Sequence, residues 1–102
     1  MKAGFFIGGY IYYAYVLYSS KFDKIYIGHT SNLEQRYTAH NLGKSKFTKK
    51  FIPWKLVYFE EFPTRSLAMK REKELKSHKG RDFIRREILG KSPAAAGLIR
   101  VS

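Results

Sequence analysis

Residues 11–18 are apolar or aromatic at both odd and even positions. A strand with two apolar faces is typical of the centre of a sheet. Residues 19–23 then predict a turn, and residues 24–28 predict the return strand of a hairpin. The pattern therefore predicts a β-hairpin whose first strand is central in its sheet.

The register of this hairpin decides whether Tyr15 and Tyr26 lie on one face of the sheet. Side chains alternate along a strand, so the two tyrosines share a face only if the numbers of opposed residues add up to an odd value. A six-residue connection that pairs Tyr18 with Ile25 meets this condition. We predict that register.

The residues after the hairpin predict a helix. Ser31 and Glu34 have the spacing of a capping box, so the helix should begin at Ser31 or Asn32 and stop at Gly43. Its inward stripe would consist of Leu33, Arg36, Tyr37 and His40. Two of these four are polar, which a purely structural helix would seldom choose.

The second half of the chain predicts one more strand and two more helices. Residues 44–52 predict a basic loop, and residues 54–62 alternate as a third strand that ends at Pro63. Ser66 can cap a second helix that runs to about Lys79 and is closed by Gly80, and a short third helix starts near Asp82. The order β-β-α-β-α-α predicts an α+β fold, a small three-stranded antiparallel sheet flanked by helices.

The chain has 102 residues, which fits one small domain, and 44% of them are apolar, enough for a modest core. Residues 1–10 contain three glycines and predict a loose lead-in. Residues 11–89 form the predicted domain. Residues 90–102 have no amphipathic period and predict a flexible tail.

The charge of the chain is strongly positive. Twenty Lys and Arg residues against eight Asp and Glu give a net charge of +12, which predicts an anionic partner, either nucleic acid or an acidic membrane surface. We favour nucleic acid, because the basic residues are spread over several elements instead of one amphipathic anchor. The residues expected to contact a nucleic-acid backbone are Lys44, Lys46, Lys49, Lys50, Lys55 and Arg71.

Other features of the composition limit the class of protein. The absence of cysteine excludes disulfides and thiolate metal sites and is compatible with a reducing, cytoplasmic location. No stretch predicts a membrane span or a signal peptide. Phe47, Phe51 and Trp54 interleave with the lysines; they would either stack on unpaired bases or pin the loop to the core.

Three side chains suggest phosphate chemistry. Arg36 and His40 are four residues apart and therefore lie on one helical face, aimed at a sheet lined by tyrosines. A guanidinium can fork onto phosphate oxygens, and a histidine or tyrosine can move protons. Glu72 lies in line with the apolar positions Ala68 and Leu75, where a carboxylate needs a partner.

The combination of Tyr15, Tyr26-Ile27-Gly28, Arg36, His40 and Glu72, in this order of elements, resembles the GIY-YIG nuclease superfamily. It is most similar to the small stand-alone bacterial members, the endonucleases that are like the nuclease domain of a DNA excision-repair protein. The resemblance runs from about Tyr12 to Leu89. Tyr13 and Ala14 depart from the family pattern, and the bulky Tyr13 could reshape the first strand.

The resemblance implies a metal-dependent DNA endonuclease with no small-molecule cofactor. Glu72 would hold one Mg²⁺ or Mn²⁺ ion whose other ligands are mostly water, and Arg36 would neutralise charge on the scissile phosphate. Tyr15 and Tyr26 would lie near the attacking water; either of them or His40 could be the general base. His29 and Thr30 would line the site. Specificity for a DNA structure would come from this domain itself or from a partner protein.

Two other functions are compatible with the sequence. A non-catalytic nucleic-acid-binding module could retain the scaffold and the charge, although such a module has no need of a carboxylate in a basic site. A protein that packs against structured RNA would differ in substrate preference, because A-form RNA presents a different groove and a 2′-hydroxyl.

Overall fold

The computed structural model describes residues 5–6 and 9–90. Its centre is a three-stranded antiparallel sheet in the order β4-β3-β5, formed by β3 (Tyr12–Ser19), β4 (Lys24–Thr30) and β5 (Lys55–Phe62). The first strand of the hairpin is central, which confirms the prediction from its two apolar faces. Tyr18 pairs with Ile25 and Tyr15 pairs with Gly28, so the predicted register is also confirmed.

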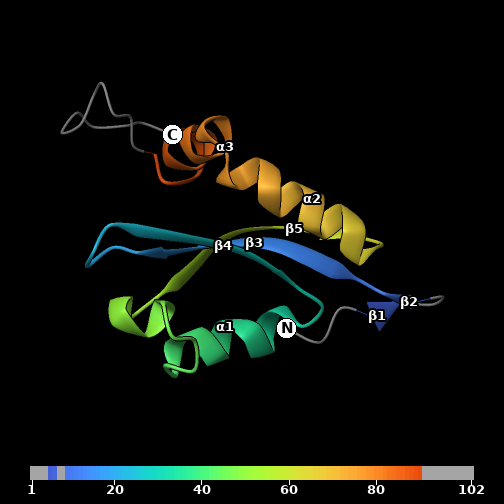
Figure 1. Ribbon diagram of the computed structural model, residues 1–102, viewed down its shortest axis with the longest axis horizontal. Coiled ribbons are helices and arrows are strands. Elements are labelled where there is room, and N and C mark those ends of the chain that lie inside the picture. The colour runs from blue at the N-terminus through green and yellow to red at the C-terminus, as the bar shows by residue number, and fades with distance from the viewer. Residues whose placement is uncertain (1–4, 7–8, 91–102) are drawn as a thin grey trace.

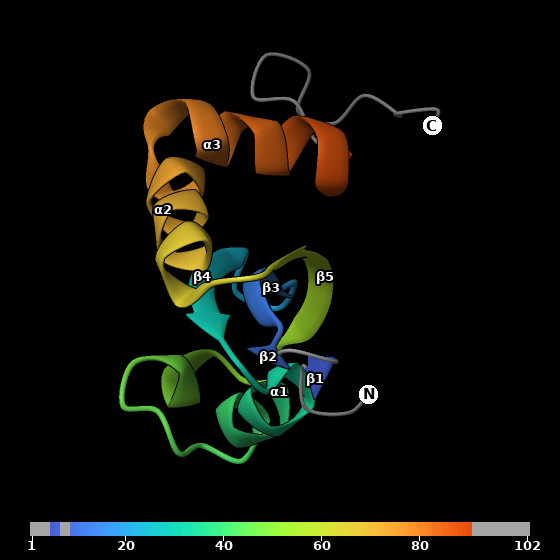
Figure 2. The same cartoon turned by 90° about the vertical axis from the view of Figure 1, so that its right-hand side faces the viewer.

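Helices cover both faces of this sheet (Figures 1 and 2). One face carries α1 (Leu33–Asn41) and the short 3₁₀ helix η1 (Thr48–Phe51), which lies within the predicted basic loop. The other face carries α2 (Arg65–Lys76), α3 (His78–Phe83) and the π-helical turn η2 (Ile84–Ile88). The predicted α+β fold with the order β-β-α-β-α-α is confirmed for this part of the chain.

Alternation along β3 divides the core between the two faces. Tyr13, Tyr15 and Leu17 pack with Leu33 of α1 and with Trp54. The intervening residues Ala14 and Val16 pack with Leu75 of α2 and Ile84 of η2. Tyr13 is 5% exposed and packs edge-on against the ring of Phe59, so the strand accommodates its bulk without losing its regular pairing with β4. The central strand therefore supports two separate apolar layers.

The first helix starts at one of its two predicted residues, whereas the cap of the second is displaced by two residues. Asn32, and not Ser31, caps α1: its side chain accepts a hydrogen bond from the backbone N–H of Gln35. Thr64, and not Ser66, caps α2 by accepting from the N–H of Leu67. Since Ser, Thr and Asn are all good caps, the sequence alone could not choose between neighbours.

The predicted boundary between the second and third helices was wrong. α2 ends at Lys76, and Ser77 breaks the helix while its Oγ accepts from the N–H of Gly80 and caps α3. Gly80 lies inside α3, where a Cβ would come within 2.2 Å of the Glu74 carbonyl oxygen. This glycine allows α3 to turn closely against the end of α2 (Figure 2), and it does not end a helix.

The termini are described only in part. Phe5–Phe6 (β1) and Gly9–Tyr10 (β2) form a short antiparallel ladder within the predicted lead-in. The predicted tail lies outside the described residues, apart from Gly90. The division into lead-in, domain and tail stays a prediction. None of the helices that the structure describes is long and apolar enough to cross a membrane.

Candidate active site

Tyr15 reaches across the edge strand of the sheet. It is 1% exposed and opposes Gly28 of β4. A Cβ at Gly28 would lie 2.7 Å from the Tyr15 hydroxyl oxygen, closer than real Cβ atoms approach their neighbours. The ring of Tyr15 therefore needs a glycine at this position to lie over β4. The glycine of the Tyr26-Ile27-Gly28 motif thus sets the position of the Tyr15 hydroxyl.

The predicted cluster of two tyrosines, an arginine and a histidine forms on the α1 face of the sheet. The ring centroid of Tyr26 lies 6.4 Å from that of Tyr15 and 4.7 Å from that of His40. The Tyr15 hydroxyl and His40 Nε2 share a hydrogen bond of 3.0 Å. Arg36 of α1 lies near both tyrosine hydroxyls, which raise the pKa of its guanidinium. Four side chains from β3, β4 and α1 thus converge at one place.

Burial and charge set the protonation of this cluster. Burial raises the pKa of Tyr15, and Tyr26 and Glu72 raise it further, whereas the nearby Arg36 lowers it. Burial alone would lower the pKa of Arg36, but the two tyrosine hydroxyls raise it. Burial and then the charge of Arg36 lower the pKa of His40 to about 4. At neutral pH Tyr15 is therefore a phenol, His40 a neutral imidazole and Arg36 a guanidinium cation.

Thr48 is a partner of His40 that the sequence did not reveal. Its Oγ1 lies 2.9 Å from His40 Nδ1, and both residues are fully buried. The segment that carries Thr48 is fixed by Trp54, whose Nε1–H donates to the Thr48 carbonyl oxygen at 2.8 Å. The side chain of Asn41 in turn accepts from the Trp54 backbone N–H at 2.7 Å. Of the two roles open for Trp54, the structure supports the pinning of the loop, since Trp54 is 2% exposed.

Glu72 approaches the same edge of the sheet from the opposite layer. His29 Nδ1 and Lys76 Nζ each donate to one of its carboxylate oxygens at 2.6 Å. Burial alone would raise the pKa of Glu72, but these hydrogen bonds lower it. The charge of Glu72 in turn raises the pKa of Tyr15. The carboxylate therefore acts electrostatically on the tyrosine cluster around the edge of β4.

The role of His29 as a partner of Glu72 was missed, although the sequence contained its signal. Side chains alternate along β4, so His29 faces away from Tyr26 and Gly28 and toward the layer of α2. That layer contains Glu72. An imidazole that donates to a carboxylate holds the carboxylate in a fixed orientation, as the outer partners of metal ligands do.

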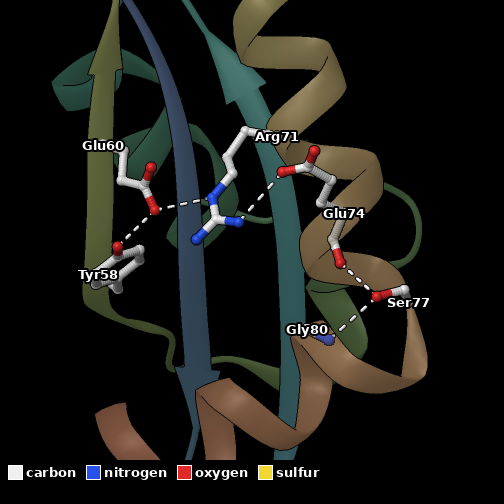
Figure 3. A network of polar contacts seen from close by, with 6 residues as sticks. All are labelled: Tyr58, Glu60, Arg71, Glu74, Ser77 and Gly80. Carbon is white, nitrogen blue, oxygen red and sulfur yellow. Dashed lines mark hydrogen bonds and ion pairs between the residues drawn. The ribbon is translucent and has the colours of Figure 1, made fainter.

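Arg71 does not join this cluster. It donates to Glu60 at 3.0 Å and to Glu74 at 3.2 Å, as Figure 3 shows. Glu60 also accepts a hydrogen bond from the Tyr58 hydroxyl. Tyr58 and Glu60 belong to β5, at the opposite edge of the sheet from β4. Two carboxylates therefore compensate the charge of Arg71, and the network ties α2 to β5.

The remaining predicted backbone contacts are exposed and lie on the α1 side of the sheet or at the start of β5. A pocket of about 350 Å³ brings Arg36 and Lys44 together with Thr30 and Gln35. The other exposed lysines of the predicted set are Lys46, Lys49, Lys50 and Lys55. Arg36 therefore lies beside a positively charged surface.

These features define a class of protein. Residues 11–86 match the family of the GIY-YIG catalytic domain, and the chain belongs to that family. A domain of this family suggests nuclease activity in general. The nucleic-acid partner expected from the charge agrees with this family.

More particular similarity is to proteins named UPF0213. A UPF0213 protein of Haloquadratum walsbyi is 41% identical over 68 residues, 66% of this chain and 75% of that protein. One from Staphylococcus haemolyticus is 43% identical over 67 residues, 65% of this chain and 80% of its own length. The solution NMR structure of the UPF0213 protein BH0048 from Bacillus halodurans is 31% identical, covers 72% of this chain and 81% of its own, and has a TM-score of 0.45.

Proposed function

We propose that this protein is a metal-dependent DNA endonuclease that hydrolyses phosphodiester bonds at the Tyr15–Arg36 cluster. The observation that carries the proposal is the cluster of Tyr15, Tyr26 and His40, in which the Tyr15 hydroxyl is bonded to His40. The charges of Arg36 and Glu72 act on the same hydroxyl. A guanidinium beside these hydroxyls is a strong donor for a phosphate oxygen. The Tyr15 hydroxyl can donate a hydrogen bond in the same place.

Glu72 is the residue that fits a divalent ion. No group of three or more His, Cys, Asp or Glu side chains that could enclose a metal occurs among residues 5–6 and 9–90. A single carboxylate suits Mg²⁺, which retains several waters and takes one or two protein carboxylates. The Glu72 side chain is 18% exposed, and Lys76, which is 48% exposed, can leave its carboxylate oxygen to a cation. A bound ion would supply Lewis-acid polarisation of the phosphoryl oxygen and of water.

The protein's own side chains then have distinct roles. Arg36 binds and orients the phosphate through its fork of N–H donors. Tyr15 stays protonated because burial raises its pKa, so its hydroxyl positions groups and does not act as a phenolate. His40 lies 3.0 Å from that hydroxyl and is neutral, so the pair can relay a proton when Nδ1–H donates to Thr48. A phosphate bound at Arg36 would offset the positive charge of the guanidinium. The pKa of His40 would then rise, and His40 would become a stronger base.

The basic surface would bind the DNA backbone. Lys44 shares its pocket with Arg36, and the exposed lysines at 46, 49, 50 and 55 extend the positive charge around it. Such contacts read little sequence and weaken with salt. We leave Arg71 out of this surface, because Glu60 and Glu74 compensate its charge.

The test is cleavage of labelled duplex, single-stranded, flapped and branched DNA with Mg²⁺, Mn²⁺ or EDTA. We expect metal-dependent cleavage by the wild type, a loss of at least about 100-fold in Arg36→Lys because the fork is lost, and a similar loss in Glu72→Gln. Lys70→Gln, an exposed charge change on the same helix as Glu72, serves as the control. Cleavage that persists in EDTA or in both site variants would refute the proposal.

A non-catalytic binding module is the second candidate, because one observation favours it. Both oxygens of Glu72 are already paired with cationic or donor groups, as expected of a carboxylate with a purely structural role. In that case all substrates would bind at low salt and none would be cut. NMR titration of Mg²⁺ separates the candidates further: metal-induced shifts that are the same in wild type and Glu72→Gln would favour the binding module.

A further inference from the structure

A row of aromatic rings leads away from the tyrosine cluster. From Tyr26 the ring centroids follow at 6.4 Å to Phe47, 5.3 Å to Phe51 and 5.5 Å to Phe22. Tyr26 starts this row beside His40. Phe22 comes from the turn between β3 and β4, and Figure 1 shows η1 beneath that end of the sheet. We call Phe22, Phe47 and Phe51 the phenylalanine row.

Two of the three rings are exposed. Phe47 is 51% and Phe22 is 41% exposed, while Phe51 is half-buried between them. Phe51 packs against the core and the ring of Trp54 and helps to position the loop. Phe47 and Phe22 are not among the residues packed against that core cluster. Exposed phenylalanines that adjoin one another form an apolar patch of the kind that marks a binding surface.

The charges around this row are positive. Lys21 Nζ lies 5.5 Å from the ring centroid of Phe22, and Lys24 Nζ lies 5.3 Å from that of Phe51. The acidic neighbour, Asp23, is bonded to Tyr18 and to Arg85. This apolar patch is edged by lysines and joined through Tyr26 to the cluster that contains Arg36. It matches a nucleotide, which has a flat base beside an anionic backbone.

We propose, building on the nuclease function above, that Phe47 and the rest of the phenylalanine row form a stacking site for an unpaired nucleobase next to the phosphate at Arg36. The substrate class is then DNA with single-stranded character at the cut. In a duplex the bases are stacked on one another, so their faces are not available without the cost of unpairing. Stacking on Phe47 needs no particular base, because each base has a flat face.

The experiment measures binding in EDTA, so that no cleavage takes place. The probe is a fluorescein-labelled dT₁₂ strand, compared by anisotropy with a 12-base-pair duplex over a range of salt concentrations. We expect Phe47→Ala to weaken binding of dT₁₂ about tenfold and binding of the duplex less than twofold. Phe47→Tyr keeps the ring and should bind like the wild type. Phe59→Ala, which removes an equally aromatic and 38% exposed side chain on β5, is the matched control.

Salt dependence separates stacking from charge. Stacking releases no counterions, so Phe47→Ala should shift the binding of dT₁₂ equally at all salt concentrations and leave the slope unchanged. Lys49→Ala, a change of charge in the same helical turn, should reduce the slope by about 0.7 for a single strand. A change of slope in Phe47→Ala would overturn the stacking role.

The outcomes also separate this proposal from the nuclease function. Equal effects of Phe47→Ala on dT₁₂ and duplex, or no effect on either, would overturn the stacking site even if DNA is cleaved. Selective loss of dT₁₂ binding would support the stacking site even if no DNA is cleaved. A U₁₂ strand that binds tenfold more tightly than dT₁₂, and alone responds to Phe47→Ala, would overturn the assignment to DNA in favour of RNA.

Discussion

The buried imidazole of His40 should make the stability of the protein depend strongly on pH. Its pKa is lowered from 6.5 to about 4 in the folded protein, by burial and then by the charge of Arg36. Between these two values the unfolded state binds more protons than the folded state. The free energy of unfolding therefore does not depend on His40 titration well above pH 6.5. It decreases as the pH is lowered from 6.5 toward 4.

The size of this effect follows from the pKa difference. About 2.5 pKa units at 1.36 kcal/mol each correspond to a loss of roughly 3 kcal/mol between pH 6.5 and pH 4. His40 has no solvent-exposed surface, so solvent screening does not reduce this figure greatly. Glu72 also loses stabilisation in acid, but only as the pH falls below about 4.5, the ordinary range of a glutamate.

The assay is urea denaturation at pH 7, 6, 5 and 4, followed by the fluorescence of Trp54, the one tryptophan of the chain. His40→Gln has no titrating group at this position and should lose about 3 kcal/mol less over this range than the wild type. Its absolute stability will differ because hydrogen bonds change, so the comparison uses the pH dependence alone. Equal losses in wild type and variant would refute the reasoning about His40.

Three further predictions concern positions that support the site. Gly28→Ala should displace the Tyr15 hydroxyl, lower stability by about 1–3 kcal/mol and reduce cleavage at least tenfold, measured by denaturation and nuclease assay. Gly80→Ala should cost at least about 2 kcal/mol, because its Cβ would meet the backbone of α2, and calorimetry should show a lower Tm. Thr48→Val removes the hydroxyl that bonds His40 and should destabilise the protein by about 1–3 kcal/mol, measured by urea denaturation.

The hairpin could be predicted because its signal is local. Period-two alternation and a short connection fixed the register of Tyr18 with Ile25, and hence the common face of Tyr15 and Tyr26. The inward position of His40 followed in the same way from helical spacing. Each of these inferences needs only the geometry of one or two adjacent elements.

Other features depended on contacts between distant segments. Thr64 and not Ser66 caps α2 because β5 ends only two residues before Thr64. The composition of the helix does not encode this position. Gly80 resembles a helix terminator in sequence, but its role is close packing against α2. The buried hydrogen bond between Thr48 and His40 joins a loop to a helix. No periodic pattern in the sequence predicts such a contact.

The placement of Glu72 and Tyr15 in opposite layers has a consequence for how the protein tolerates change. Glu72 belongs to α2, which packs through Leu75 in one core, whereas Tyr15 packs with Leu33 of α1 in the other core. Tyr15 belongs to β3 and Glu72 to α2, so each group is positioned by the packing of its own layer. A substitution that changes the packing of one core should therefore move one of the two groups relative to the other.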